Sequence, residues 1–176
     1  MTTIAAKEVN GKVKIAWDSQ VTYGGSAEFG AVKVQTINEQ LTLGGAGHLR
    51  YLNLAFRTRL PGIHPVDLAN PNFDGLGWIL DCAIPEWMEA VKEEKKRLVD
   101  EESGIPSGVL IVILGGKIYS VGEDFSVTQV EDYCAVGSGS KYARTAMYLG
   151  KNPKQAVEIA ADLDIYTGGK IKELAL

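Results

Sequence analysis

Residues 2–22 read TTIAAKEVNGKVKIAWDSQVT and contain two strand-like runs, 3–9 and 12–17. Between the runs lies Asn10-Gly11, the preferred pair for a two-residue hairpin, because both turn positions must tolerate a positive φ angle. The second run also alternates apolar and other side chains, as a half-buried strand does. The chain is therefore expected to open with an antiparallel hairpin.

The turn fixes the register of this hairpin. If Val9 pairs with Lys12, then Thr3 lies opposite Asp18, and a carboxylate returns to the beginning of the chain. Regular alternation puts the Asp18 side chain on the face opposite that of Thr2. A direct contact between Thr2 and Asp18 is therefore not expected, and a link between them needs a third residue.

The rest of the chain predicts an α+β protein. After a turn rich in small residues (23–30), further strands are expected at 31–37, 40–46, 107–114, 117–121, 133–136 and 171–176. Helices are expected from Gly47 to Pro61 with Leu49, Leu52, Phe56 and Leu60 facing inward, at 75–99 with a kink at Pro85, from a Ser140 cap to Gly150, and from Asn152-Pro153 onward. Strands, helices, strands and helices in that order favour layered α+β architecture over a parallel βαβ sheet.

The composition suits one soluble domain covering residues 1–176, with 45% hydrophobic and 23% charged residues. A net charge of −4 with scattered Lys and Arg argues against nucleic acid as a partner. No apolar run reaches the roughly 20 residues that span a bilayer, and no secretion signal is evident. A cytoplasmic location is expected, where Cys82 and Cys134 remain thiols.

The second residue offers a specific chemistry. Removal of Met1 by methionine aminopeptidase would leave Thr2 with a free α-amine, whose pKa of about 7.7–8.0 suits a general base at neutral pH. Threonine paired with its own amine is a known type of activated nucleophile. Many proteins begin Met-Thr without such a role, so this feature needs support from elsewhere in the chain.

That support comes from a family resemblance. The opening 2–22 segment, the lysine of AVKV (31–34), GGAGH (44–48), AVGSGSKYA (135–143) and IAADLDIYTGG (159–169) resemble the proteasome β-subunit family in order and spacing. Within that family the bacterial HslV-type threonine peptidases are the most similar. The resemblance covers most of the chain except 57–105, and it implies the αββα sandwich of N-terminal nucleophile hydrolases.

The resemblance assigns the chemistry to three residues. Thr2 matches the nucleophile, Asp18 the family aspartate, and Lys33 the lysine whose ammonium lies between the two. A cation there favours the deprotonated hydroxyl and keeps the α-amine neutral, while Asp18 holds the lysine. The match of Lys33 requires a one-residue gap relative to HslV-type chains.

Four supporting residues also follow from the resemblance. Gly47 matches the oxyanion-hole donor, where a glycine lets the substrate carbonyl approach the backbone. Ser138 matches the serine near the threonine amine, and Asp164 and Thr167 match the pair that supports the N-terminus. Asp164 replaces the cysteine of HslV-type chains. Taken singly, each of these residues has an ordinary explanation as a turn, cap or surface residue.

Substrate and cation sites are implied in the same way. Gly45, Ala31 and Leu49 align with pocket positions, and a glycine at 45 suggests an empty floor that accepts large neutral residues before the cut bond. The alternative is that Gly45 only permits a backbone bend. The carbonyls of Ala161, Asp164 and Thr167 align with a cation site, at which a monovalent cation would be structural.

The resulting expectation is a threonine endopeptidase that cuts amide bonds through an acyl-enzyme ester and requires no metal or organic cofactor. The family implies a homo-oligomeric double ring of six- or seven-fold symmetry, an AAA+ unfoldase partner and unfolded polypeptide substrates. Two alternatives remain, a non-catalytic ring subunit and an N-terminal-nucleophile amidase acting on a small molecule.

Overall fold

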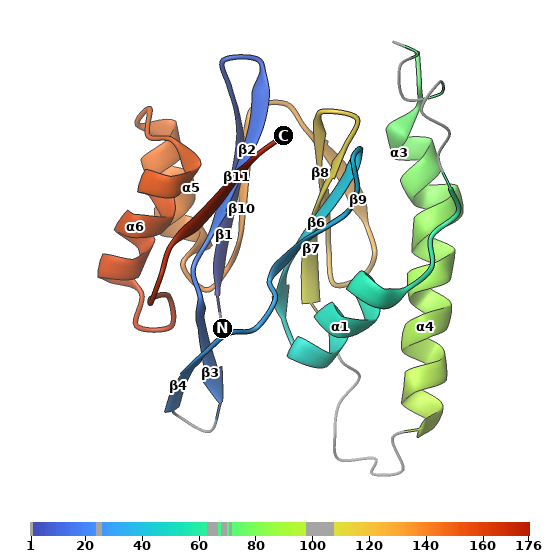
Figure 1. Ribbon diagram of the computed structural model, residues 1–176, viewed down its shortest axis with the longest axis horizontal. Helices are drawn as coiled ribbons and strands as arrows, with labels where there is room; N and C mark the ends of the chain where they lie inside the picture. The colour runs from blue at the N-terminus through green and yellow to red at the C-terminus, as the bar shows by residue number, and fades with distance from the viewer. Residues whose placement is uncertain (1, 24–25, 63–66, 68–69, 71, 98–107) are drawn as a thin grey trace.

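The computed structural model describes residues 2–23, 26–62, 67, 70, 72–97 and 108–176. Two β-sheets pack face to face between two layers of helices, which is the predicted αββα arrangement (Figure 1). The first sheet has the strand order β10-β1-β2-β11 and the second β5-β6-β7-β8-β9, while β3 and β4 form a separate hairpin.

The elements follow the expected order along the chain. The strands are β1 (Thr3–Val9), β2 (Lys12–Trp17), β3 (Gln20–Tyr23), β4 (Ser26–Phe29), β5 (Val34–Asn38), β6 (Leu41–Gly47), β7 (Gly108–Leu114), β8 (Lys117–Val121), β9 (Val127–Val130), β10 (Tyr133–Gly137) and β11 (Lys172–Ala175). The helices are α1 (Leu49–Arg57), α3 (Gly75–Trp78), a π-helical turn (Ile79–Ala83), α4 (Ile84–Arg97), α5 (Ser140–Tyr148) and α6 (Pro153–Leu163). Among the described residues, no helix is long and apolar enough to cross a membrane.

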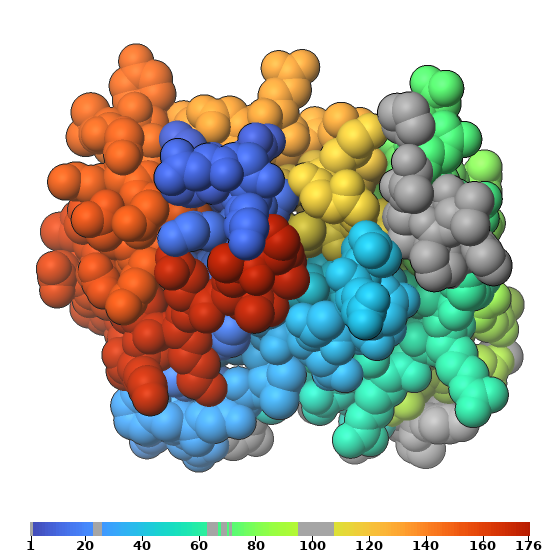
Figure 2. All heavy atoms as spheres, turned by 45° about the horizontal axis from the view of Figure 1, so that its top comes forward, coloured from blue at the N-terminus to red at the C-terminus, as the bar shows by residue number. Residues whose placement is uncertain are grey.

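The opening hairpin has the predicted turn and register. Asn10 and Gly11 both have positive φ angles, 54° and 76°, as the tight turn requires. Pairing runs from Val9 with Lys12 to Ile4 with Trp17. The C-terminal strand β11 lies along the other side of β2, so both ends of the chain meet in this sheet (Figure 2).

Alternation along β1 divides its side chains between two cores. Ile4 and Ala6 face the second sheet, where they join a β-branched cluster that includes Ile111 and Ile113. Ala5 faces the other way, toward α5 and α6. The first four residues of β1, which follow Thr2, are therefore buried on both faces of the strand.

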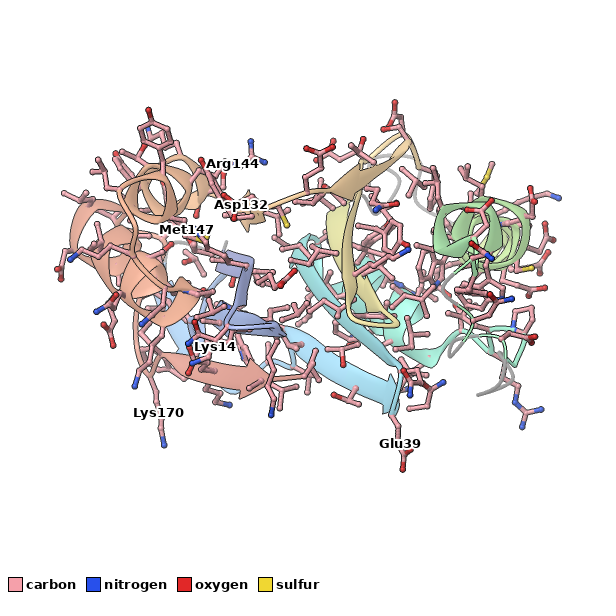
Figure 3. All side chains as sticks on the ribbon, turned by 90° about the horizontal axis from the view of Figure 1, so that it is seen from above. Lys14, Glu39, Asp132, Arg144, Met147 and Lys170 are labelled. Carbon is pink, nitrogen blue, oxygen red and sulfur yellow. The ribbon has the colours of Figure 1, made fainter. Side chains whose placement is uncertain are left out.

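Small side chains bring α5 and α6 close to the first sheet. Their shared core consists mainly of alanines: Ala5, Ala16, Ala135, Ala143, Ala146, Ala156 and Ala160, with Met147 and Val157. Arg144 on α5 also donates to the carbonyl of Ala135 on β10 through Nε (3.1 Å) and Nη2 (2.9 Å). Arg144 and Met147 are labelled in the view from above (Figure 3). This helical layer supports the back of β1 and β10.

The opposite layer contains the larger side chains. Trp87 of α4 and Ile79 of the π-helical turn pack with Leu52 and Phe56 of α1 against the second sheet. The π-helical turn directly precedes the turn that contains Pro85, which has no N–H to donate to the carbonyl four residues earlier. The kink expected at Pro85 stays a prediction.

Several local expectations were wrong. Gln20–Tyr23 pairs with Ser26–Phe29 as strands β3 and β4, where a turn was expected at 23–30, and β9 was not foreseen. Gly139, not Ser140, is the N-cap of α5, and α1 ends at Arg57. Leu49 is 41% exposed and does not face inward with Leu52. Asn152 does cap α6, with a complete capping box to Gln155.

The alanine layer gives a stability prediction. Ala156 is fully buried between α6 and the first sheet, so Ala156→Leu should overpack the layer and lower the free energy of unfolding by about 1–3 kcal/mol. Glu158→Leu adds the same side chain to the exposed face of α6 and serves as the control. Urea unfolding measures both. Equal stability of the two variants would contradict the packing described.

Candidate active site

Residues that lie far apart in the sequence meet at the start of β1. Thr2 immediately precedes β1, Asp18 follows β2, and Lys33 precedes β5. All three side chains are buried, with exposed fractions of 4%, 0% and 3%. The two sheets and the turn after β2 therefore bring together a hydroxyl, a carboxylate and an ammonium group.

The hydroxyl and the ammonium share one oxygen of the carboxylate. Thr2 Oγ1 donates to Asp18 Oδ1 at 2.7 Å, and Lys33 Nζ donates to the same atom at 2.9 Å. The predicted absence of a direct contact between Thr2 and Asp18 was wrong. Regular pairing ends at Ile4 and Trp17, so strand alternation does not govern the two side chains beyond it.

Backbone amides hold the Asp18 carboxylate from both sides. Oδ1 also accepts the N–H of Thr3 at 2.8 Å, and Oδ2 accepts the N–H groups of Gln20 and Gly168, each at 3.1 Å. These donors satisfy both oxygens of the carboxylate in its buried position. Asp18 is thereby fixed as the anchor of the site.

Lys33 is held by charge and by a carbonyl. Its Nζ donates to Asp18 and to the Gln20 carbonyl oxygen. Burial lowers the pKa of Lys33 below its usual value, while the Asp18 charge and hydrogen bond act in the opposite direction. The ammonium proton is therefore less tightly held than that of a surface lysine.

A second network lies behind Thr2. Ser138 donates its Oγ to Asp164 Oδ2 at 2.6 Å, and Thr167 Oγ1 donates to the same oxygen at 2.7 Å. Ser138 also donates its backbone N–H to the Thr2 carbonyl at 2.9 Å. Burial acts to raise the pKa of Asp164, but these hydroxyl bonds and the N–H of Tyr166 bring it below the ordinary value. The three predicted residues thus form one unit against Thr2.

Two residues of this network were missed by sequence reasoning. The Thr3 hydroxyl lies 2.6 Å from that of Thr167 and accepts the Gly139 N–H at 3.1 Å. Gly137 has a φ of 94°, and a Cβ there would overlap the Thr2 carbonyl oxygen. The sequence could have indicated both residues, because each is adjacent to a residue that was predicted: Thr3 follows Thr2, and Gly137 precedes Ser138.

A small cavity opens beside the Thr2 hydroxyl. It has a volume of about 20 Å³ and is lined by Thr2, Val21, Ala31, Lys33, Ala46, Gly47, Leu49 and Leu52. Gly47, with a φ of 126°, brings backbone to the edge of the cavity. Ala31 and Leu49 thus border the nucleophile candidate, as their predicted substrate-binding role requires.

Gly45 is not among the described residues that line this cavity, and the cavity they enclose at Thr2 is small, whereas a roomy pocket was expected. A Cβ at Gly45 would overlap Leu52 Cδ2 and lie 2.9 Å from Leu110 Cδ2. The space above the glycine is therefore filled by the side chain of Leu52. Sequence reasoning placed Leu52 in the core only, because helical periodicity does not show which strand residue a helix covers.

The predicted cation ligands lie at the end of α6 and in the turn after it. Ala161 belongs to the last turn of the helix, and the carbonyl of Asp164 accepts the N–H of Thr167 at 2.9 Å. Carbonyl oxygens suit a hard cation, and each retains a second lone pair after accepting one hydrogen bond. A cation at these three carbonyls stays a prediction. Met1, whose removal would free the α-amine of Thr2, lies outside the described residues.

Two curated proteins are similar in sequence to nearly the whole of this chain. No family model matches it. The ATP-dependent protease subunit HslV of Ligilactobacillus salivarius (strain UCC118) is 29% identical over 99% of this chain and 100% of its own length. The HslV subunit of Lactobacillus leichmannii is 26% identical, over 97% of this chain and 96% of its own.

Solved structures share the fold. Thiobacillus denitrificans BPH superposes with a TM-score of 0.74 at 19% identity, covering 99% of this chain and 97% of its own. Eukaryotic HslV from Trypanosoma brucei superposes with a TM-score of 0.67 at 22% identity, covering 99% and 98%. The predicted αββα sandwich fold is thus confirmed.

The shared oxygen of Asp18 leads to a prediction for Lys33. Because the Asp18 charge raises the lysine pKa against the effect of burial, Asp18→Asn should lower that pKa further, so that Nζ loses its proton at a lower pH. Titration followed by NMR of the labelled lysine measures the change, with circular dichroism to verify folding. Asp132→Asn removes an exposed carboxylate paired with Lys7 and is the control. An unchanged or higher pKa for Lys33 in Asp18→Asn would contradict the described geometry.

Proposed function

We propose that this chain, which is proteasome-β/HslV-like in sequence and fold, is the threonine peptidase subunit of an ATP-dependent protease, with Thr2 as its nucleophile. The observation that carries the proposal is the single Asp18 oxygen that binds both the Thr2 hydroxyl and the Lys33 ammonium, beside a cavity. This is the arrangement that an N-terminal nucleophile needs, with a hydroxyl, a fixed cation and room for a carbonyl.

The reaction begins with removal of Met1, which frees the α-amine of Thr2. That amine takes the proton of the hydroxyl while Oγ1 attacks the carbonyl carbon of a peptide bond. The Lys33 ammonium stabilises the developing alkoxide, and Asp18 keeps the ammonium in place. Gly47 offers its N–H to the carbonyl oxygen as that atom becomes negative.

Collapse of the tetrahedral intermediate breaks the C–N bond and leaves an ester on Thr2. The protonated amine returns its proton to the departing nitrogen, so charge and protons balance. Water then attacks the ester with the same amine as its base, releasing the acid and restoring the hydroxyl. Ser138, Asp164 and Thr167 hold the first residue in position. None of these steps requires a metal or an organic cofactor, and a monovalent cation at Ala161, Asp164 and Thr167 would only stabilise the turn.

The assembly is inferred from the relatives. Two of them are named subunits of an ATP-dependent protease. We propose a homo-oligomeric double ring in the cytoplasm, supplied with unfolded polypeptides by an AAA+ unfoldase, because an exposed non-selective peptidase would damage its own cell. A non-catalytic ring subunit would retain Met1, and a small-molecule amidase would act without an ATPase.

Replacement of the hydroxyl tests the nucleophile. In protein shown by intact mass to lack Met1, Thr2→Ala should lower kcat/KM for a fluorogenic peptide by at least about 10³-fold, because no covalent ester can form. Thr2→Ser keeps the hydroxyl and should retain measurable turnover. Complete retention of Met1 in assembled protein, or near-normal turnover by Thr2→Ala, would refute the role of Thr2.

Lys33 needs a separate measure of folding. Because Asp18 is fully buried, Lys33→Ala leaves an uncompensated carboxylate and should cost about 3–5 kcal/mol of stability as well as activity. Its loss of turnover is therefore informative only beside an unfolding curve, whereas the Thr2 variants remove no charge.

Ring formation gives an independent prediction. The purified chain should scatter light as a homo-oligomer many times its 19.0 kDa mass, with six or seven subunits in each of two rings. Sedimentation or light scattering over a concentration series measures this. A stable monomer at micromolar concentration would favour the small-molecule amidase.

A further inference from the structure

We propose that Leu52 of α1 is the specificity-determining residue of the candidate active site, and that it restricts the side chain before the cut bond to small neutral groups. This inference rests on the proposed peptidase function and gives its substrate class. It reverses the preference for large residues that Gly45 suggested in the sequence.

The first support is the fit between Leu52 and Gly45. Gly45 lies on β6, with the side chains of Leu52 and Leu110 directly over its Cα. Any side chain at position 45 would collide with Leu52. The space left by the missing side chain of Gly45 is therefore not open to a substrate, because the side chain of Leu52 from α1 occupies it.

The second support is the size of the cavity at Thr2. Leu52 is one of its walls, and its volume of about 20 Å³ exceeds only slightly the roughly 10–15 Å³ that one water molecule needs. A group of about the size of a methyl fills this space, and a leucine or tyrosine side chain would extend beyond it. Ala31 and Ala46 contribute small walls. The two leucine walls differ in burial, because Leu49 is 41% exposed and Leu52 is 3% exposed, so Leu52 is the bulky wall on the buried side of the cavity.

The third support is that Leu52 is held in place. It is 3% exposed and belongs to the cluster that includes Phe56, Leu110 and Trp87. Its backbone N–H donates to the carbonyl of His48 at 3.2 Å, in the first turn of α1. A close-packed side chain of this kind does not swing aside without loss of contacts, so a larger substrate would have to displace core packing.

The electrostatics of the cavity favour a neutral group. Among its described lining residues, Lys33 alone carries a charge, and its Nζ is already bound by Asp18 and the Gln20 carbonyl. An acidic side chain would compete with Asp18 for that ammonium, and a basic one would be repelled by it. Alanine is the substrate residue that these walls fit.

The experiment compares tetrapeptides that differ only in the residue before a fluorogenic amide, namely Ala, Val, Leu or Tyr. The wild-type assembly should cleave the Ala peptide with a kcat/KM at least about 10-fold above that for Tyr, as misfits in an apolar pocket usually produce. Leu52→Ala should raise kcat/KM for Tyr and Leu at least about 10-fold and leave Ala within a few-fold. Leu54→Ala, half-buried on the same helix and not a wall of this cavity, should leave the ranking unchanged.

Each result decides a different point. Equal or faster wild-type cleavage of Tyr and Leu peptides would overturn the assignment without any variant. An unchanged ranking of the four peptides in folded Leu52→Ala would also overturn the assignment. If that variant does not fold, Leu52→Val removes less of the core and should shift the ranking the same way by a smaller factor. Failure to cleave any peptide with Met1 removed would instead contradict the proposed function itself.

Discussion

A buried carboxylate organises this molecule. Asp18 is fully inaccessible, and a charge in such a position is tolerated only when it is paired and hydrogen-bonded. Its donors come from segments scattered along the chain: Thr2 Oγ1, Thr3 N–H, Gln20 N–H, Lys33 Nζ and Gly168 N–H. Neither sheet alone could supply this set, so the positions of β1, β3, β5 and the segment after α6 all depend on it.

The sandwich explains why these segments can converge. Alanines let α5 and α6 approach the first sheet closely, and the turn after α6 then delivers Thr167 and Gly168 to the start of β1. The absence of a Cβ at Gly137 allows β10 to reach the Thr2 carbonyl. Thr2 is therefore bounded by Asp18 on one side and by the Ser138 network on the other, and these contacts fix its hydroxyl. Preorganisation of this type is what a nucleophile and its stabilising charges require.

Sequence reasoning succeeded where local rules determine the structure. The Asn10-Gly11 turn set the hairpin register, and Asn152 with Gln155 set the start of α6. It failed where contacts are tertiary: strand alternation said nothing about Thr2 and Asp18 beyond the last paired residues, and the β3–β4 hairpin has no strong alternation of its own. The family resemblance correctly named the residues that meet at the site: Thr2, Asp18, Lys33, Ser138, Asp164 and Thr167. Local periodicity and spacing could not have done so, because most of these residues lie far apart in the sequence.

The substrate cavity shows why a single aligned position can mislead. Gly45 viewed alone indicates an empty floor, yet the volume beside Thr2 depends on which side chain of α1 lies over β6. The glycine on the strand leaves room for the leucine on the following helix, so the space between the two elements is filled, as in other close-packed cores. The residue that limits the size of the cavity therefore lies on the helix and not on the sheet. That size is a property of the contact between two elements, and it follows from their packing and not from residue 45 considered by itself.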